Sequence, residues 1–185
     1  MAMSADKTKQ LGIVGSLRGA SYSRAVLEAI RDGMAPEVEI TIHDLAPVPM
    51  YNAELDGEDK PAAVVALKQA IAEADGLVIS SPEYNYSVPG VLKNAIDWAS
   101  RPAFKSVLTG TPAVVMTVSP AFTGGVRAQA HLKQVMLACL VDLLPHPDLV
   151  FARAGELFEE GKLKDPAVID VACDAVRALA ARIRG

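Results

Sequence analysis

The alternation of short apolar runs with helical periods is the feature that most constrains the fold of this chain. Apolar runs occupy residues 11–15, 76–80, 112–119 and 148–152. Between and after them lie segments whose apolar residues recur every three or four positions, at 23–34, 61–75, 88–100, 126–140 and 166–184. Such an alternation of strands and helices predicts an α/β protein with a parallel sheet and helices on both of its faces.

Residues 38–45 form a strand of a different kind. Here Val38, Ile40 and Ile42 alternate with polar residues, which is typical of a strand with one exposed face. Strands covered on both sides are apolar throughout, so we place this second strand at an edge. The order 2-1-3-4-5 puts it there, whereas the Rossmann order 3-2-1-4-5-6 would bury it. The pattern therefore predicts a flavodoxin-like three-layer sandwich with a five-stranded parallel sheet.

The length of the chain predicts one domain. Its 185 residues fall within the usual size of a single domain, roughly 100–200 residues, so we assign residues 1–185 to one unit. The polar residues 1–9 are expected to form a disordered tail. Residues 46–60 are polar and contain proline, and they exceed an ordinary connection in length. We interpret this segment as a binding or dimer loop.

Composition and charge exclude several classes of protein. Hydrophobic residues make up 51% of the chain, which excludes a disordered protein. With 22 acidic and 18 basic residues, the net charge of −4 argues against nucleic-acid or anionic-membrane partners. No apolar stretch approaches the roughly 18 residues of a membrane span, so membrane insertion is not expected. We expect a cytoplasmic protein.

Metal and disulfide chemistry are not expected either. Cys139 and Cys173 form no CxxC pair, so neither a disulfide framework nor a zinc site is indicated. His43, His131 and His146 are scattered along the chain, and three unclustered histidines do not make a metal site.

The first candidate ligand loop is GSLRGASYS at 15–23. In a parallel sheet of this kind, ligands bind beyond the carboxyl ends of the strands, and this loop follows the first strand and opens a helix. Helix N-termini attract anions, and Ser16, Ser21, Ser23 and Arg18 add donors that suit a phosphate. The loop matches neither GxxxxGK[ST] nor GxGxxG. The plain alternative is a serine cap followed by a solvated arginine.

Two further loops follow the third and fourth strands. In SPEYNYSVPG, beginning at residue 81, the prolines stiffen the backbone, and Tyr84 and Tyr86 offer flat apolar faces with polar tips. In SPAFTGGVRAQ (119–129), Ser119 is a hydrogen-bond donor and the two glycines permit close backbone approach. An ordinary rigid turn and a flexible connector are the alternatives. Together the three loops predict a site for a phosphate and a planar heterocycle, and FMN fits best.

These motifs resemble those of the NADPH-dependent FMN reductase family, which includes bacterial quinone and chromate reductases. The resemblance rests on G-S-x-R-x-x-S-x-S after the first strand and on PEYNYSVPGVLKNAIDWASRP after the third, and it covers roughly residues 10–150. It implies the following cofactor contacts. Ser16, Arg18, Ser21 and Ser23 hold the FMN phosphate; Pro82, Glu83, Tyr84, Asn85 and Tyr86 line the isoalloxazine, largely through main chain; and Ser119 contacts the pyrimidine side.

The resemblance also implies an activity. FMN N5 would accept a hydride from NADPH or NADH and pass it by a ping-pong mechanism to a small-molecule acceptor, such as a quinone, free flavin, chromate, ferric chelate or azo compound. Because the flavin carries this chemistry, no catalytic side chain is assigned. A homodimer or homotetramer is expected. The alternatives are a flavodoxin-type electron carrier, although such carriers are usually more acidic, and a flavin-free phosphate-ligand module.

Three charged residues are left open. Glu83 is either a ligand or a solvated loop charge. Arg101 is either a solvated helix end or an attractor for an anionic acceptor or for the NADPH phosphate. Arg127, which follows the glycine pair, is equally consistent with an ion pair at a subunit interface.

Overall fold

The sheet places the second strand at its edge. The computed structural model describes residues 7–35 and 37–185. Its main strands, β1 (Thr8–Val14), β2 (Val38–His43), β3 (Gly76–Ser81) and β4 (Pro112–Val118), are parallel in the order β2-β1-β3-β4. In this register Ile13 lies between His43 and Ile79. The α/β class, the strand order and the flavodoxin-like arrangement are thereby confirmed.

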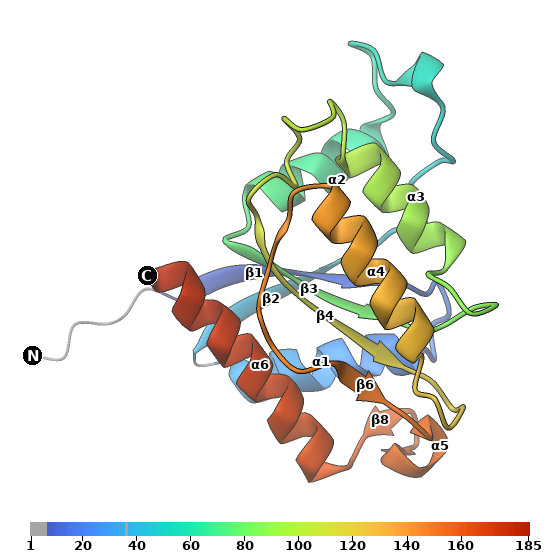
Figure 1. Cartoon of the computed structure of the whole chain (residues 1–185), viewed down its shortest axis with the longest axis vertical. Coiled ribbons are helices and arrows are strands. Elements are labelled where there is room, and N and C mark those ends of the chain that lie inside the picture. Colours follow the sequence, from blue (N-terminus) through green and yellow to red (C-terminus); the bar gives the residue numbers. More distant parts are fainter. Residues whose placement is uncertain (1–6, 36) are drawn as a thin grey trace, which may run out of the picture.

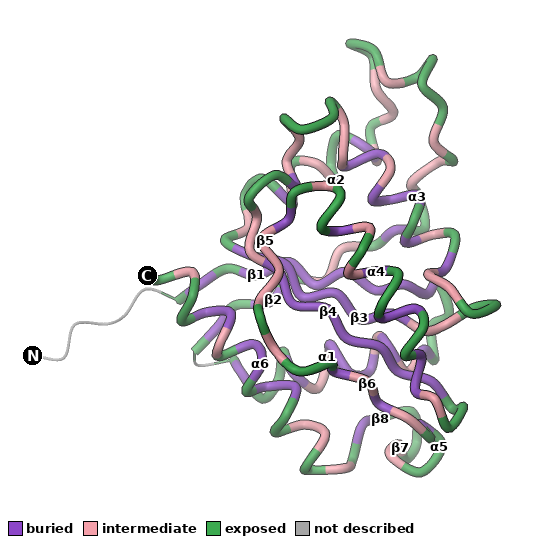
Figure 2. Tube along the Cα trace, in the orientation of Figure 1, coloured by how far each residue is buried: buried purple, intermediate pink, exposed green. Residues whose placement is uncertain are grey.

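Helices cover both faces of the sheet (Figure 1). On one face lie α1 (Tyr22–Met34) and α6 (Pro166–Arg184), and on the other lie α2 (Ala62–Ala72), α3 (Gly90–Ala99) and α4 (Val126–Ala138). Alternate residues of β3 serve the two cores: Val78 packs with α1 and α6, whereas Leu77 and Ile79 pack with the other three helices. The central strands are buried along their length (Figure 2), which explains why their sequences do not alternate.

The fifth position of the sheet differs from the prediction. The expected strand at 148–152 is present as β6 (Leu149–Phe151), but a second short strand, β5 (Asp142–Leu143), pairs with an earlier part of β4. Prolines 145 and 147 lie between them, and a proline cannot donate a backbone hydrogen bond. The sheet therefore has six strands, two of which share one position. In the stretch of β4 between the two pairings, the buried Gln129 donates from Nε2 to Val115 O at 3.0 Å.

A small unit after β6 was not predicted. It consists of the short helix α5 (Ala154–Leu157) and a hairpin of β7 (Phe158–Glu159) and β8 (Lys162–Leu163). The ring of Phe158 packs on that of Tyr22, the first residue of α1, with 4.7 Å between centroids. The unit thus supports the start of α1.

The tail was predicted too long. Thr8 and Lys9 belong to β1 rather than to a tail: Thr8 pairs with Val38, and Lys9 N–H donates to the carboxylate of Asp75 at 2.7 Å. The sequence analysis assigned these residues to a tail because they are polar. The first residues of β1 do carry polar side chains, but their backbones pair with β2. Of the other predicted tail residues, Lys7 is exposed and precedes β1, and residues 1–6 lie outside the described residues.

The long segment 46–60 is fastened to α3. Asn94 accepts from Tyr51 N–H at 2.7 Å and donates to Pro49 O at 2.8 Å, and the indole of Trp98 donates to the same carbonyl at 2.8 Å. Beyond these contacts the segment contains one 3₁₀ turn, η1 (Ala53–Leu55), and is mostly exposed. Its use as a binding or dimer loop stays a prediction.

Replacing Trp98 with phenylalanine should lower the free energy of unfolding by about 1–3 kcal/mol, because the carbonyl of Pro49 loses a buried donor and the site loses volume. Urea unfolding followed by circular dichroism measures this effect, since Trp98 is the only tryptophan and fluorescence is lost with it. An unchanged midpoint would show that the indole hydrogen bond contributes nothing to stability.

Candidate functional site

Three loops meet at one edge of the sheet because β1, β3 and β4 are parallel and end on the same side. They span residues 15–21, 82–89 and 119–125 and lead into α1, α3 and α4 (Figure 1). This edge is where a doubly wound sheet binds its ligands. Arg101 does not lie there. It follows α3 at the end opposite Gly90, with its guanidinium carbon 5.6 Å from the centre of the Tyr51 ring.

The first loop turns tightly against β3. Gly15 N–H donates to Ser80 O at 2.8 Å, and a Cβ atom at Gly15 would stand only 2.5 Å from Ser81 Oγ. Only glycine allows the chain to pass this close. Beyond it, Ser16 is buried and its Oγ accepts from Arg18 N–H at 3.3 Å, while Arg18 itself is exposed. A buried hydroxyl and a solvent-facing guanidinium therefore share one turn.

The start of α1 is open to an anion. Ser21 is the N-cap residue, with an extended backbone (φ −83°, ψ 130°), yet its side chain makes no capping hydrogen bond. The hydroxyl of Ser23 is buried without a hydrogen-bond partner among the described residues. The N–H groups of a first helical turn also lack partners within the helix. Donors of this kind at a helix N-terminus are typical of a phosphate site.

The second loop is a strained turn. Tyr84 and Ser87 exchange two backbone hydrogen bonds, of 3.1 and 3.0 Å. The two residues between them, Asn85 and Tyr86, both have positive φ, 49° and 65°. This is the geometry of a type I′ turn, in which glycine is usual and tyrosine is not. Residues other than glycine with a positive φ are uncommon, and they concentrate at functional sites.

A pocket of about 400 Å³ joins the first loop to the second. It is lined by Ser16, Leu17, Arg18, Tyr84, Pro89, Gly90 and Val91. The structure thus brings together three of the predicted residues, Ser16, Arg18 and Tyr84. Leu17, Pro89, Gly90 and Val91 were not predicted as site residues, although all four lie within the recognised motifs and the last three form the entry into α3. Pro82, Asn85 and Tyr86 lie elsewhere on the second loop, and Ser21 and Ser23 lie at the start of α1.

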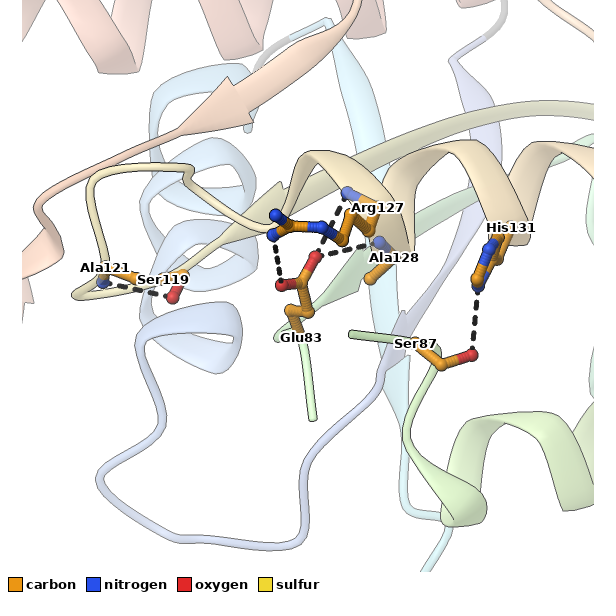
Figure 3. Close-up of polar contacts among 7 residues, drawn as sticks. All are labelled: Glu83, Ser87, Ser119, Ala121, Arg127, Ala128 and His131. Atoms are coloured by element: carbon orange, nitrogen blue, oxygen red, sulfur yellow. Dashed lines mark hydrogen bonds and ion pairs between the residues drawn. The ribbon is translucent and has the colours of Figure 1, made fainter. Parts of the chain in front are cut away.

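The hydroxyl of Ser119 is used within its own loop. Ser119 is buried, and its Oγ accepts from Ala121 N–H at 3.2 Å (Figure 3). Its backbone N–H donates to Phe151 O at 3.0 Å, which fixes the loop to β6. Ser119 does not line the pocket between the first two loops, and its predicted contact with the cofactor is untested by this geometry.

Glu83 is not a solvated loop charge. Its Oε2 accepts from the backbone N–H groups of Arg127 and Ala128, both at 3.0 Å, at the N-terminus of α4 (Figure 3). Its Oε1 lies 3.7 Å from Nη1 of Arg127, so Arg127 has a partner within its own chain. The guanidinium of Arg127 in turn stacks on the Tyr86 ring, 4.3 Å from its centre. The sequence analysis missed this arrangement, because nothing local in the sequence pairs residues so far apart.

Neither a cluster of metal ligands nor a membrane-spanning helix is found among the described residues. Within residues 7–35 and 37–185, no three His, Cys, Asp or Glu side chains are grouped so as to hold a metal ion. None of the helices in the described part of the chain has the length and apolar character needed to cross a bilayer.

Known proteins are similar to this chain in sequence and in fold. The profile of the NADPH-dependent FMN reductase family matches residues 8–156. The NAD(P)H-dependent FMN reductase PA1204 of Pseudomonas aeruginosa is 37% identical over 180 residues, covering 97% of both chains. A quinone reductase of Escherichia coli K12 is 36% identical over 168 residues, covering 85% of this chain and 89% of the relative.

The same agreement holds for solved structures. FerB of Paracoccus denitrificans, a flavoenzyme described as an NAD(P)H:(acceptor) oxidoreductase, superimposes with a TM-score of 0.86 at 30% identity, covering 96% of this chain and 97% of the other. The resemblance predicted from the loop motifs is confirmed, and with it the prediction of an oxidoreductase that works with FMN and NAD(P)H. The chain belongs to the NADPH-dependent FMN reductase family.

Proposed function

We propose that this chain binds FMN at the edge formed by its three loops and catalyses the NAD(P)H-dependent reduction of small-molecule acceptors, quinones above all. One observation carries the proposal: an open pocket of about 400 Å³ lies between the Ser16–Arg18 turn and the residues that lead into α3. Such a pocket has the size expected for a small-molecule or cofactor site.

The phosphate end of the cofactor is assigned to the start of α1. Ser16, Arg18, Ser21 and Ser23 would hold it there, together with the unpartnered N–H groups of the first helical turn. The N-terminus of α4 is a poorer choice, because the carboxylate of Glu83 already accepts from its first N–H groups. A second anion there would meet a like charge.

The ring of the cofactor is assigned to the second and third loops. Peptide groups from Pro82 to Tyr86 would line the isoalloxazine, and Ser119 and its neighbours would approach the pyrimidine side. When bound, FMN supplies a site at N5 that accepts and returns a hydride. The chain itself orients the ring and shields one side of it, so we assign no catalytic acid or base to a side chain.

The acceptor is proposed to be flat and apolar. Leu17, Tyr84, Tyr86 and Phe122 are large hydrophobic side chains that are exposed on the three loops, and exposed apolar surface of this kind marks binding sites. Relatives named as quinone reductases support a quinone. Free flavin and azo compounds are flat as well, whereas chromate and ferric chelates would need only access to the open face of the flavin.

Three further properties are part of the proposal. Nicotinamide and acceptor would use the same face in turn, which gives ping-pong kinetics. A homodimer or homotetramer is proposed because the resemblance to the FMN reductase family implies one. A cytoplasmic location agrees with two cysteines that are both free, Cys139 and Cys173.

Anaerobic mixing tests the proposal. NADPH added to the FMN-loaded protein should abolish the yellow flavin absorbance promptly, and a quinone added afterwards should restore it. A flavodoxin-type carrier would bind FMN but keep its colour with NADPH, and a phosphate-ligand module would show no affinity for FMN. Initial velocities measured against both substrates should give parallel lines, and intersecting lines would exclude the ping-pong order.

A further inference from the structure

The turn at residues 82–87 is fastened to α4 at several points. Glu83 accepts from the first N–H groups of the helix, and Ser87 Oγ lies 3.1 Å from Nδ1 of His131 (Figure 3). Arg127 in addition stacks on Tyr86. All of the helix residues involved come from the first turns of α4. The first two turns of α4 therefore support the turn at residues 82–87.

Glu83 makes the most enclosed of these contacts. Only 11% of its side chain is exposed, and one of its oxygens accepts two hydrogen bonds of 3.0 Å. The N-cap residue of α4 is Gly125, which has no side chain with which to cap the helix. A carboxylate from another loop takes that part, and it gains from the positive end of the helix as well as from the hydrogen bonds.

The turn needs such a fastening. Asn85 and Tyr86 hold left-handed backbone conformations that a free loop would leave, and such conformations persist only when the surroundings enforce them. The side chains of Tyr84 and Tyr86 are exposed, so the turn gains little from burial of its own. The two backbone hydrogen bonds between Tyr84 and Ser87 close the turn, and the contacts with α4 add the side-chain restraints that hold it against the helix.

We propose that Glu83 is a positioning residue: by tying the turn to the N-terminus of α4, its carboxylate holds the peptide groups of residues 84–86 where they receive the ring of the bound flavin. This inference rests on the proposed function, since it concerns the same site. It gives Glu83 no contact with the reacting atoms.

Comparing FMN with riboflavin separates the ring from the phosphate. In the Glu83→Ala variant the affinities for FMN and riboflavin should fall by the same factor, about 10-fold to 100-fold, as expected for the loss of charge-assisted hydrogen bonds. Glu83→Gln keeps an oxygen that can accept from the helix and should recover much of the loss. Fluorescence titration of the apoprotein measures both ligands.

Asp148→Ala is the matched control. Asp148 is also a carboxylate paired with α4, through Lys133, but it lies away from the turn. Its removal should leave both affinities unchanged. Equal losses in Asp148→Ala and Glu83→Ala would overturn the proposal, because they would mean that any loosening of α4 has the same effect.

The remaining outcomes are also decisive. If the unaltered chain binds riboflavin and Glu83→Ala binds it equally well, the inference is wrong while the proposed function stands. If the unaltered chain binds neither ligand, the proposed function fails first. Circular dichroism shows whether each variant is folded. Should Glu83→Ala not fold, Glu83→Leu, which keeps the bulk of the side chain but has no hydrogen-bond acceptor, decides in its place. A riboflavin affinity of Glu83→Leu that is identical to that of the unaltered chain overturns the proposal.

Discussion

Replacing Arg18 with alanine should weaken FMN binding by about 10-fold to 100-fold and leave riboflavin binding unchanged. Arg18 is exposed on the turn that lines the pocket, and its backbone is fixed by the bond to Ser16. A guanidinium facing a phosphate makes hydrogen bonds between charged groups, which are about twice as strong as those between neutral ones. Riboflavin has no phosphate and should not sense the change.

Arg31→Ala controls for the loss of charge. Arg31 lies near the other end of α1 and pairs with Asp32 at the surface, so it shares the helix but not the pocket. Titrations of both variants with FMN should show a loss for Arg18→Ala alone. If Arg18→Ala retained full FMN affinity, or lost riboflavin affinity to the same degree, the phosphate would be assigned to the wrong place.

Replacing Gly124 with alanine should lower the free energy of unfolding by about 3 kcal/mol or more. Gly124 has φ +62°, and a Cβ atom there would lie 2.6 Å from Val150 Cγ1 and 2.9 Å from the backbone nitrogen of Ala152. The backbone of β6 and its extension cannot yield easily, so the third loop would be pushed away from the sheet. Chemical unfolding in guanidinium measures the loss.

Two other glycines separate the causes of this effect. Gly110 has a similar φ of +75° but open space around it, so Gly110→Ala should show only the conformational strain, about 1–2 kcal/mol. Gly57 has neither feature, and Gly57→Ala should be close to neutral. A Gly124→Ala variant no less stable than Gly110→Ala would mean that the close approach to Ala152 is relaxed without cost.

The strand order could be predicted because it depends on burial, which the sequence records residue by residue. Val38, Ile40 and Ile42 alternate with polar neighbours, and that pattern suits only an edge. The division of the fifth strand could not be predicted in the same way. Asp142 and Leu143 are too few to show a period. They pair with the first residues of β4, which β6 does not reach, and that arrangement is not visible in the sequence.

In the candidate site, too, some features could be predicted from the sequence and others could not. The serines and Arg18 of the first loop could be proposed from the sequence because the type of side chain and its place after a strand both indicate an anion. The capping role of Glu83 was missed, since it accepts from residues more than forty positions away. The turn with two positive φ values at Asn85 and Tyr86 could not be predicted either, because the usual sequence signal for such a turn is Asn-Gly. Both the position of Glu83 and the conformation of the turn involve contacts with α4, which only the folded structure reveals.

The aromatic contact between Tyr22 and Phe158 has a consequence for exchanging parts among relatives. Phe158 lies just past residue 156, the last residue that the family profile matches, yet its ring packs on Tyr22, the first residue of α1. A hybrid protein joined at residue 156 would bring in a foreign side chain against Tyr22 and disturb the opposite end of the polypeptide. Grafting should therefore move positions 22 and 158 together.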